Sequence, residues 1–314
     1  MTGVFLSRLA PELHRFLAFK RSLGFLYRRN EFTLRSFDRY VASHSCPKGR
    51  LPLERLLRGW LSRIESRKAV TVAMDLAALR EFFKFRKRAD PAAFVPGREW
   101  APQSVESHFV PHVFSIGDVK ALLKAAGEVP RGRFRALTLR TALVVLYCTG
   151  LRPGEAGRLR LGDVDLGRRV FTIRETKGKT RLVPFRQDLA RVIRQYLRKR
   201  SELKPASDLI FIRRDGRDLG SQALCEWIRR LFRRAGLKPA RGRLGPRPFD
   251  MRHTFATHRL TRWYRTGADL HARLPWLSAY MGHDDLLGTE TYLTATPELL
   301  AAAGQRFRRR VEPR

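Results

Sequence analysis

Residues that interrupt regular structure cluster between positions 91 and 111 of this 314-residue chain. Three prolines and a glycine lie between residues 91 and 102, and Pro111 follows. Proline lacks a backbone donor and glycine lacks a side chain, so such a cluster interrupts any helix or strand. The cluster predicts two domains, residues 1–105 and residues 106–314. The length also favours two domains, since about 100–200 residues per domain is usual.

The first predicted domain carries apolar residues at helical spacing. Leu9, Leu13 and Phe16 recur at intervals of four and three, the period of a helix with one buried face. Residues 51–64 and 72–85 show a similar pattern, and many of the positions between the apolar residues are arginine or lysine. We expect a small, basic, helical domain.

The second predicted domain combines helices with one short sheet. Ser115 suits the N-cap of a helix at 118–126, and the apolar run 138–148 predicts a buried helix with Cys148 in the core. Two segments of alternating β-branched residues flank Gly178, which predicts a β-hairpin. The strands are expected at 170–175 and 181–185, and further helices at 189–199, 222–234, 252–260 and 274–281. The predicted fold is mostly α with a small β-sheet.

The charge of the chain indicates the kind of partner it binds. Sixty-four lysines and arginines against 29 acidic residues give a formal net charge of +35. A surface this basic attracts a polyanion, which means DNA, RNA or an anionic membrane. Most of the basic residues are arginine, whose planar fork suits bidentate contacts to phosphate, so nucleic acid is favoured.

Cysteine spacing and hydropathy indicate the cellular compartment in which the protein works. Cys46, Cys148 and Cys225 are widely spaced and form neither a CxxC pair nor a zinc pattern. No apolar run reaches the ~20 residues of a membrane span. The N-terminus has no basic region followed by an apolar core, as a secretory signal would. We expect a cytoplasmic protein with no membrane partner, associated with the bacterial nucleoid through DNA.

Five short motifs follow one another in the second predicted domain. Each is weak evidence alone, and their order along one chain is what makes them specific. They are TGLRPGE at 149–155, TKGKTR at 176–181, DMRHTFATH at 250–258, YMGH at 280–283, and Tyr292 nine positions after His283.

In these motifs the chain resembles the tyrosine recombinase (phage integrase) family. That family carries a TGLR..E box, a lysine in a β-hairpin, an RHTFAT box, an LGH box and a tyrosine nine residues beyond that histidine. The resemblance implies a catalytic domain at 106–314 and a helical core-binding domain at 1–105, which together clamp duplex DNA. Residues 274–298 are similar to recombinases carried by transposons, with chromosome resolution and phage integration as alternatives.

The resemblance assigns three residues to the reacting phosphate. A phosphodiester gains negative charge on its oxygens as a nucleophile attacks, and fixed cations stabilise that state. Arg152 and Arg252 are implied to bind the two non-bridging oxygens. Tyr292 is the implied nucleophile, which forms a 3′-phosphotyrosine and frees a 5′-hydroxyl. Tyrosine has a pKa of about 10, and two nearby guanidinium groups favour its phenolate form.

Further residues are implied to move protons or orient the site. Lys177 would protonate the leaving 5′-oxygen, with Lys179 of the same hairpin as the alternative. His283 would hydrogen-bond the phosphate or assist proton movement. Glu155, three positions after Arg152, is expected to orient the site. We expect no cofactor and no metal, because the sequence has no phosphate-binding glycine loop and no acidic cluster.

One position departs from the family pattern. A histidine usually stands three residues before the second arginine, and here that position is Phe249, which can neither give nor take a proton. The enzyme then works with one proton-transfer group fewer, borrows another, or depends on partners. His253 and His258 are expected to pack or to support the site.

The resemblance also implies the partners. Double-stranded DNA is the substrate, a homo-tetramer assembles on two DNA sites, and sister recombinases are further candidates. The function predicted first is a site-specific recombinase that serves a mobile element. A regulator that clamps DNA without chemistry and a type IB topoisomerase-like relaxing enzyme are the alternatives. Covalent attachment to DNA separates the recombinase from the regulator, and strand exchange separates it from the topoisomerase.

Overall fold

The computed structural model describes residues 4–44, 52–102, 111–130, 132–174, 180–242 and 244–283. The chain divides into two compact units, residues 1–109 and residues 110–314, and each is described here by itself. The predicted boundary at residue 105 lies among residues 103–110, which are not described. The DNA-binding role of the first unit stays a prediction.

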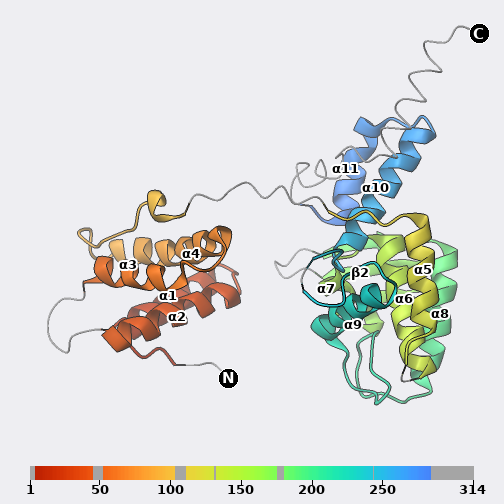
Figure 1. Ribbon diagram of the computed structural model, residues 1–314, viewed down its shortest axis with the longest axis horizontal. Helices are drawn as coiled ribbons and strands as arrows, with labels where there is room; N and C mark the ends of the chain where they lie inside the picture. The colour runs from red at the N-terminus through yellow and green to blue at the C-terminus, as the bar shows by residue number, and fades with distance from the viewer. Residues whose placement is uncertain are drawn as a thin grey trace, which may run out of the picture. The chain divides into compact units, whose positions relative to one another are not determined.

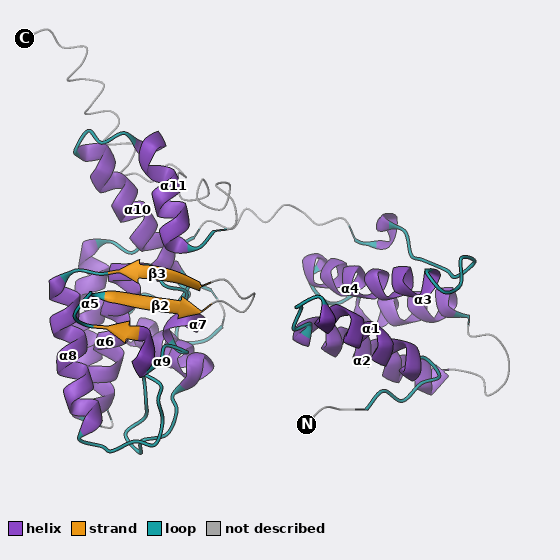
Figure 2. Cartoon of the chain, turned by 180° about the vertical axis from the view of Figure 1, so that it is seen from behind, coloured by secondary structure: helices purple, strands orange, loops and turns teal. Residues whose placement is uncertain are grey.

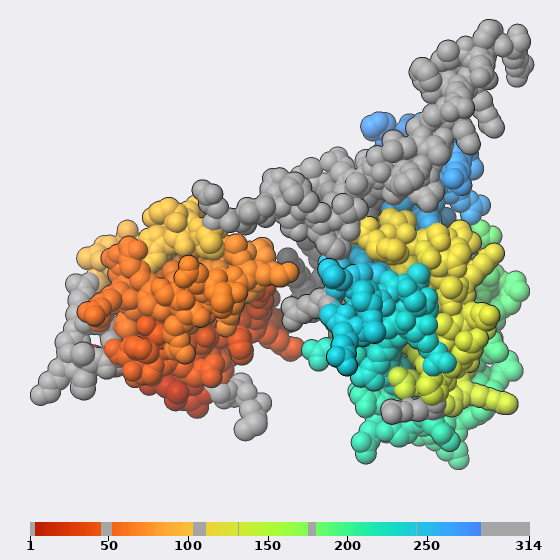
Figure 3. All heavy atoms as spheres, viewed as in Figure 1, coloured from red at the N-terminus to blue at the C-terminus, as the bar shows by residue number. Residues whose placement is uncertain are grey.

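The first unit is a helical bundle, as the apolar periodicity predicts. Phe16, Phe37 and Phe82 are fully withdrawn from solvent in its core, and Figure 3 shows one outer face of this unit, coloured from red to orange. The carboxylate of Asp38 accepts hydrogen bonds from the backbone N–H groups of Leu6 (2.6 Å) and Ser7 (3.1 Å), which fastens the N-terminal segment to the bundle. Its helices are α1 (Ala10–Ser22), α2 (Arg28–His44), α3 (Leu53–Ile64) and α4 (Ala69–Lys87), followed by the 3-10 turn η1 (Arg98–Trp100).

The described part of the second unit contains seven α-helices and one sheet (Figure 1). Its elements before the sheet are α5 (Ile116–Gly127), α6 (Arg133–Thr149), the short α7 (Pro153–Ala156) and the 3-10 turn η2 (Leu161–Asp163). The strands are β1 (Val164–Asp165), β2 (Val170–Arg174) and β3 (Thr180–Pro184), and the later helices are α8 (Gln187–Ser201), α9 (Gly220–Arg234), α10 (Asp250–Arg265) and α11 (Leu270–Met281). Ser115 caps α5 as predicted, accepting a hydrogen bond from Asp118 N at 3.0 Å.

The predicted hairpin forms the larger part of an antiparallel sheet in the order β1-β2-β3 (Figure 2). Phe171 pairs with Val183 and Ile173 with Arg181 across β2 and β3. Phe171, Ile173 and Val183 are buried, so this face of the hairpin packs on the core. The third strand, β1, was not predicted, because two residues are too few to show an alternating pattern.

Helix α6 lies at the centre of the second unit and packs against α5, α8 and α10. Most of its apolar run is buried as predicted, Val144 and Tyr147 are half-buried, and Cys148 is the exception. That side chain is exposed, because it lies on the stripe of α6 that borders a groove of about 830 Å³ lined also by Tyr147, Phe255 and Tyr280. The prediction that Cys148 belongs to the core was therefore wrong. Among the helices that the structure describes, none is both long and apolar enough to cross a membrane.

Candidate active site

A glycine turn sets the position of Arg152. Helix α6 ends at Thr149, and Gly150 adopts the left-handed conformation with φ of 62°. A Cβ atom at Gly150 would lie 2.4 Å from the ring of Phe255 on α10, so both the backbone angle and the close approach require glycine. The chain turns sharply here, and Arg152 follows as the N-cap of α7, with Pro153 at the first helical position.

Glu155 holds Arg152 in place. The Arg152 backbone N–H donates to Glu155 Oε2 and the guanidinium Nη1 donates to Oε1, both at 2.8 Å. Burial alone raises the pKa of Glu155, but hydrogen bonds and charge from Arg181 and Arg152 outweigh it and lower the pKa below its usual value. The carboxylate therefore stays ionised, and the predicted orienting contact between Glu155 and Arg152 is present.

Arg252 is one of the most buried side chains of the unit, at 1% exposure. It lies in the first turn of α10, where Nη1 donates to Gly150 O at 2.9 Å and Nη2 donates to Met281 O at 2.6 Å. Nη2 also lies 2.8 Å from Nε2 of His283. A guanidinium can only donate, so Nε2 of His283 is the acceptor in this contact.

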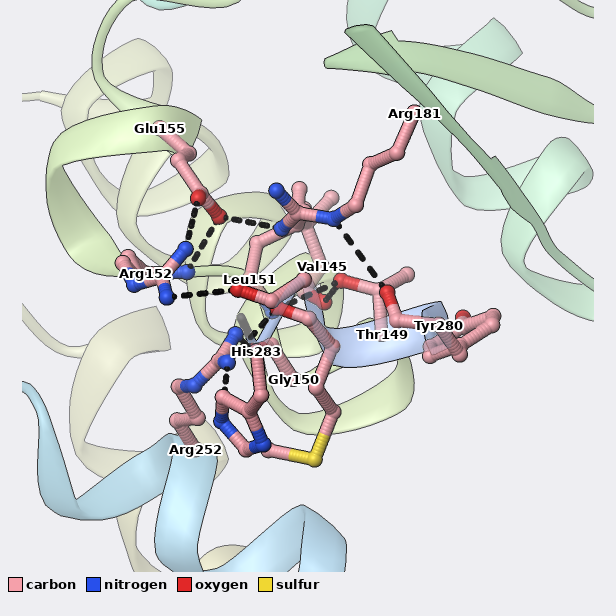
Figure 4. Close-up of polar contacts among 12 residues, drawn as sticks. Val145, Thr149, Gly150, Leu151, Arg152, Glu155, Arg181, Arg252, Tyr280 and His283 are labelled. Atoms are coloured by element: carbon pink, nitrogen blue, oxygen red, sulfur yellow. Dashed lines mark hydrogen bonds and ion pairs between the residues drawn. The ribbon is translucent and has the colours of Figure 1, made fainter. Parts of the chain in front are cut away.

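The end of α11 is where these residues meet (Figure 4). The helix ends at Met281, Gly282 is left-handed with φ of 69°, and the N–H of His283 donates to Ser278 O at 3.1 Å. Three successive carbonyls, those of Tyr280, Met281 and Gly282, accept hydrogen bonds from Arg181, Arg252 and Arg152 respectively. Cations at this position suit the negative end of the helix dipole.

Arg181 is the one residue here that the sequence reasoning did not single out. It lies on β3 with its side chain only 11% exposed, and it donates to Glu155 Oε2 at 2.8 Å and to Tyr280 O at 3.2 Å. A signal was present in the sequence, because Arg181 shares a strand face with the buried Val183. A charged residue on the core-facing side of a hairpin needs a partner.

The structure brings together three of the five predicted catalytic residues, Arg152, Arg252 and His283. Lys177 and Tyr292 lie outside the described residues, as does Lys179. Within the described part of the chain, no three histidine, cysteine or acidic side chains are grouped as a metal site would require.

Phe249 stands at the N-cap of α10, 37% exposed, and faces the ring of His253 edge-on at 5.3 Å between centroids. Burial lowers the pKa of His253, and the positive charges of Arg247 and Arg252 lower it further against the opposing effect of Asp250. His253 is therefore neutral at neutral pH. His258 Nδ1 lies 3.1 Å from the Tyr147 hydroxyl, which fits the packing role expected for it.

Comparison with known protein families settles the relationship that these contacts suggest. The model of the phage integrase family matches residues 114–298. The chain belongs to the phage integrase family. It is a tyrosine-type site-specific recombinase, and the match contains all five motifs, from Thr149 to Tyr292.

Individual relatives of this recombinase agree with the family match. The protein y4rB of Sinorhizobium fredii, named as an integrase or recombinase, is 35% identical over 98% of this chain and 100% of its own length. The Tn1549 transposon integrase in complex with transposon right-end DNA has the same fold, with a TM-score of 0.66 at 18% identity, over 94% of this chain and 99% of that one. A lambda integrase tetramer bound to a Holliday junction gives 0.61 at 17% identity, over 90% and 76%.

Proposed function

We propose that this recombinase cuts and rejoins duplex DNA at a specific site through a covalent bond from Tyr292 to a 3′-phosphate. The observation that carries the proposal is the meeting of Arg152, Arg252 and His283 at the end of α11, from segments up to 131 positions apart. Arginines fixed by buried partners are oriented before substrate arrives, which is what electrostatic stabilisation of a transition state needs.

Cleavage is an exchange of phosphate ester bonds at the scissile phosphorus. The Tyr292 phenolate oxygen attacks phosphorus, the bond from phosphorus to the 5′-oxygen breaks, and Lys177 gives a proton to that oxygen. The guanidinium groups of Arg152 and Arg252 bind the non-bridging oxygens as charge builds on them. Rejoining is the reverse, with a 5′-hydroxyl attacking the phosphotyrosine. The bond energy is kept in the covalent intermediate, so the reaction consumes no nucleotide.

We further propose the substrate, the domain roles and the assembly of this recombinase. Double-stranded DNA is the substrate, residues 1–105 form a core-binding domain, and residues 106–314 form the catalytic domain. The +35 charge supports binding to a polyanion. Four copies on two DNA sites would exchange strands, as the tetrameric lambda integrase complex suggests, with sister recombinases as further partners. The fold shared with the Tn1549 integrase favours a mobile element as the source, and a DNA substrate would place the protein at the bacterial nucleoid in the cytoplasm.

The covalent intermediate is the direct test. The DNA flanking the gene would be searched for inverted repeats, and a nicked suicide substrate built on the site incubated with the protein. On a denaturing gel, wild type should give a protein–DNA adduct and Tyr292→Phe should give none. An adduct that survives Tyr292→Phe would place the nucleophile elsewhere. Binding without any adduct would instead indicate a regulator, and relaxation without strand exchange a topoisomerase-like enzyme.

A further inference from the structure

The end of α11 is held by three arginines, and only two of them have a role in the proposed chemistry. Arg152, Arg252 and Arg181 reach it from the α6–α7 turn, from α10 and from β3, and each donates to a different carbonyl. Arg181 is too deeply withdrawn, at 11% exposure, to be an ordinary surface cation. Its function must be exerted through the groups it touches.

The group that Arg181 touches most closely is the carboxylate that also binds Arg152. In Figure 4 Glu155 lies between the two guanidinium groups, with Oε1 2.8 Å from Arg152 Nη1 and Oε2 2.8 Å from Arg181 Nη2. Glu155 is itself buried at 8% exposure. A buried carboxylate shared with one arginine would cancel that arginine's charge at short range, whereas two arginines and one carboxylate leave a net positive charge.

Arg181 also fixes the backbone on which the site depends. Its Nε donates to Tyr280 O, one residue before the carbonyl that accepts from Arg252 and two before the one that accepts from Arg152. Since Arg181 sits at the start of β3, it ties the sheet, α7 and α11 to one another through a single side chain. A lysine could not do this, because both contacts come from one planar fork.

We propose that Arg181 is a positioning residue for recombination. It offsets the charge of Glu155 and fixes the end of α11, so that Arg152 keeps the orientation and net charge needed to bind one non-bridging oxygen of the scissile phosphate. The inference rests on the proposed function, in which Arg152 acts on that phosphate. Arg181 itself does not touch the substrate.

The chain offers a matched control in Arg174. This arginine lies on β2 opposite Thr180, the residue that precedes Arg181 on β3. It too pairs with a carboxylate, that of Asp163, at 2.9 Å. Its side chain is 70% exposed, and among the described residues its hydrogen bond goes to Asp163, away from Glu155 and α11. Arg174→Met therefore removes an arginine–carboxylate pair from the same sheet without altering the supports of Arg152.

The test compares cleavage of a suicide substrate with a normal scissile phosphate and one with a methylphosphonate there. The methylphosphonate lacks one negative oxygen, so an arginine that serves that oxygen becomes dispensable. Outer-shell groups that orient the ligands of a metal site typically contribute about 10- to 100-fold to activity, and we expect an effect of similar size for a group that orients Arg152. On the normal phosphate, Arg181→Met and Arg181→Lys should lower the cleavage rate by about that factor. On the methylphosphonate diastereomer that also rescues Arg152→Ala, the same substitutions should lower the rate by less than about threefold. Arg174→Met should cleave both substrates as wild type does.

A second measurement keeps the inference testable if Arg181→Met is poorly folded. In a Glu155→Gln background, Arg181→Met should cost far less cleavage than in wild type, because the charge that it offsets is gone. Equal losses on both substrates, or additive losses in the double variant, would reduce Arg181 to a structural residue and overturn the proposal. Wild type that cleaves neither substrate would instead overturn the proposed function itself.

Discussion

Arg152 and Arg252 differ in how far each is withdrawn from solvent, although both are proposed to bind the scissile phosphate. The Arg152 side chain is 36% exposed and is held by Glu155. Arg252 is 1% exposed, and it satisfies carbonyls from two distant turns, Gly150 and Met281. A residue that fills a polar core position contributes to stability as well as to chemistry. Substitution of Arg252 should therefore lower the free energy of unfolding more than substitution of Arg152.

We predict that Arg152→Ala and Arg252→Ala both abolish cleavage, while only Arg252→Ala strongly destabilises the fold. Loss of a transition-state donor costs about 10²- to 10³-fold in rate. Each buried carbonyl left without a donor costs about 1–3 kcal/mol, so Arg252→Ala should lower the free energy of unfolding by about 3 kcal/mol. Denaturant unfolding checks this, with binding of uncleaved DNA as the control for folding. Equal stability of the two variants would contradict the structural role given to Arg252.

At the scale of elements, the site depends on the packing of the four-residue helix α7, which is too short to be stable alone. It packs against α9 at Gly157, where an added Cβ would lie 2.5 Å from Ser221 Cα. The obstacle is backbone, which cannot rotate aside as a long side chain can. Gly157 therefore allows α7 to approach α9 closely and so determines where Arg152 and Glu155 lie.

Gly157→Ala should displace α7 and reduce both stability and cleavage. Overpacking of this kind costs about 1–3 kcal/mol, and a small shift of Arg152 would lower the cleavage rate as well. Gly162→Ala is the matched control, because an added Cβ there meets nothing within 4 Å. Thermal unfolding and suicide-substrate cleavage would be measured for both. A Gly157→Ala protein as stable and active as Gly162→Ala would show that α7 tolerates the shift.

At the scale of the whole molecule, the dominant property is the net charge of +35. Arginines and lysines occur in both units, so phosphate contacts are expected from both. Each phosphate neutralised releases condensed counterions, which makes the affinity fall steeply as salt rises.

We predict that DNA binding weakens by about 10³-fold or more between 50 and 200 mM salt, as for proteins that make 6–10 phosphate contacts. Fluorescence anisotropy with a labelled duplex, titrated at several salt concentrations, measures this. A change of less than about tenfold over that range would mean that few phosphates are neutralised, and would contradict a clamp around the duplex.

Features that depend on near neighbours in the chain could be predicted from the amino-acid sequence. Helical periodicity placed α3, α4, α8 and α9 within a few residues of their observed bounds, and alternation placed the hairpin of β2 and β3. These patterns are local, because a helix or hairpin buries one face with residues a few positions apart. The family resemblance of the motifs likewise pointed to Arg152, Arg252 and His283, which the structure brings together.

The contacts between those elements could not be predicted from the sequence and were seen only in the folded structure. The contact of Arg152 with Gly282 O spans 130 positions and that of Arg181 with Tyr280 O spans 99, so no window of sequence contains either. Cys148 shows the same limit, since its apolar neighbours predicted burial while the packing of α6 left it beside a groove. Every residue carries the same backbone carbonyl, so the sequence does not show which carbonyls will bind an arginine. The three arginines at the end of α11 could be recognised only from the folded structure, which shows that the carbonyls of its last turn lie within their reach.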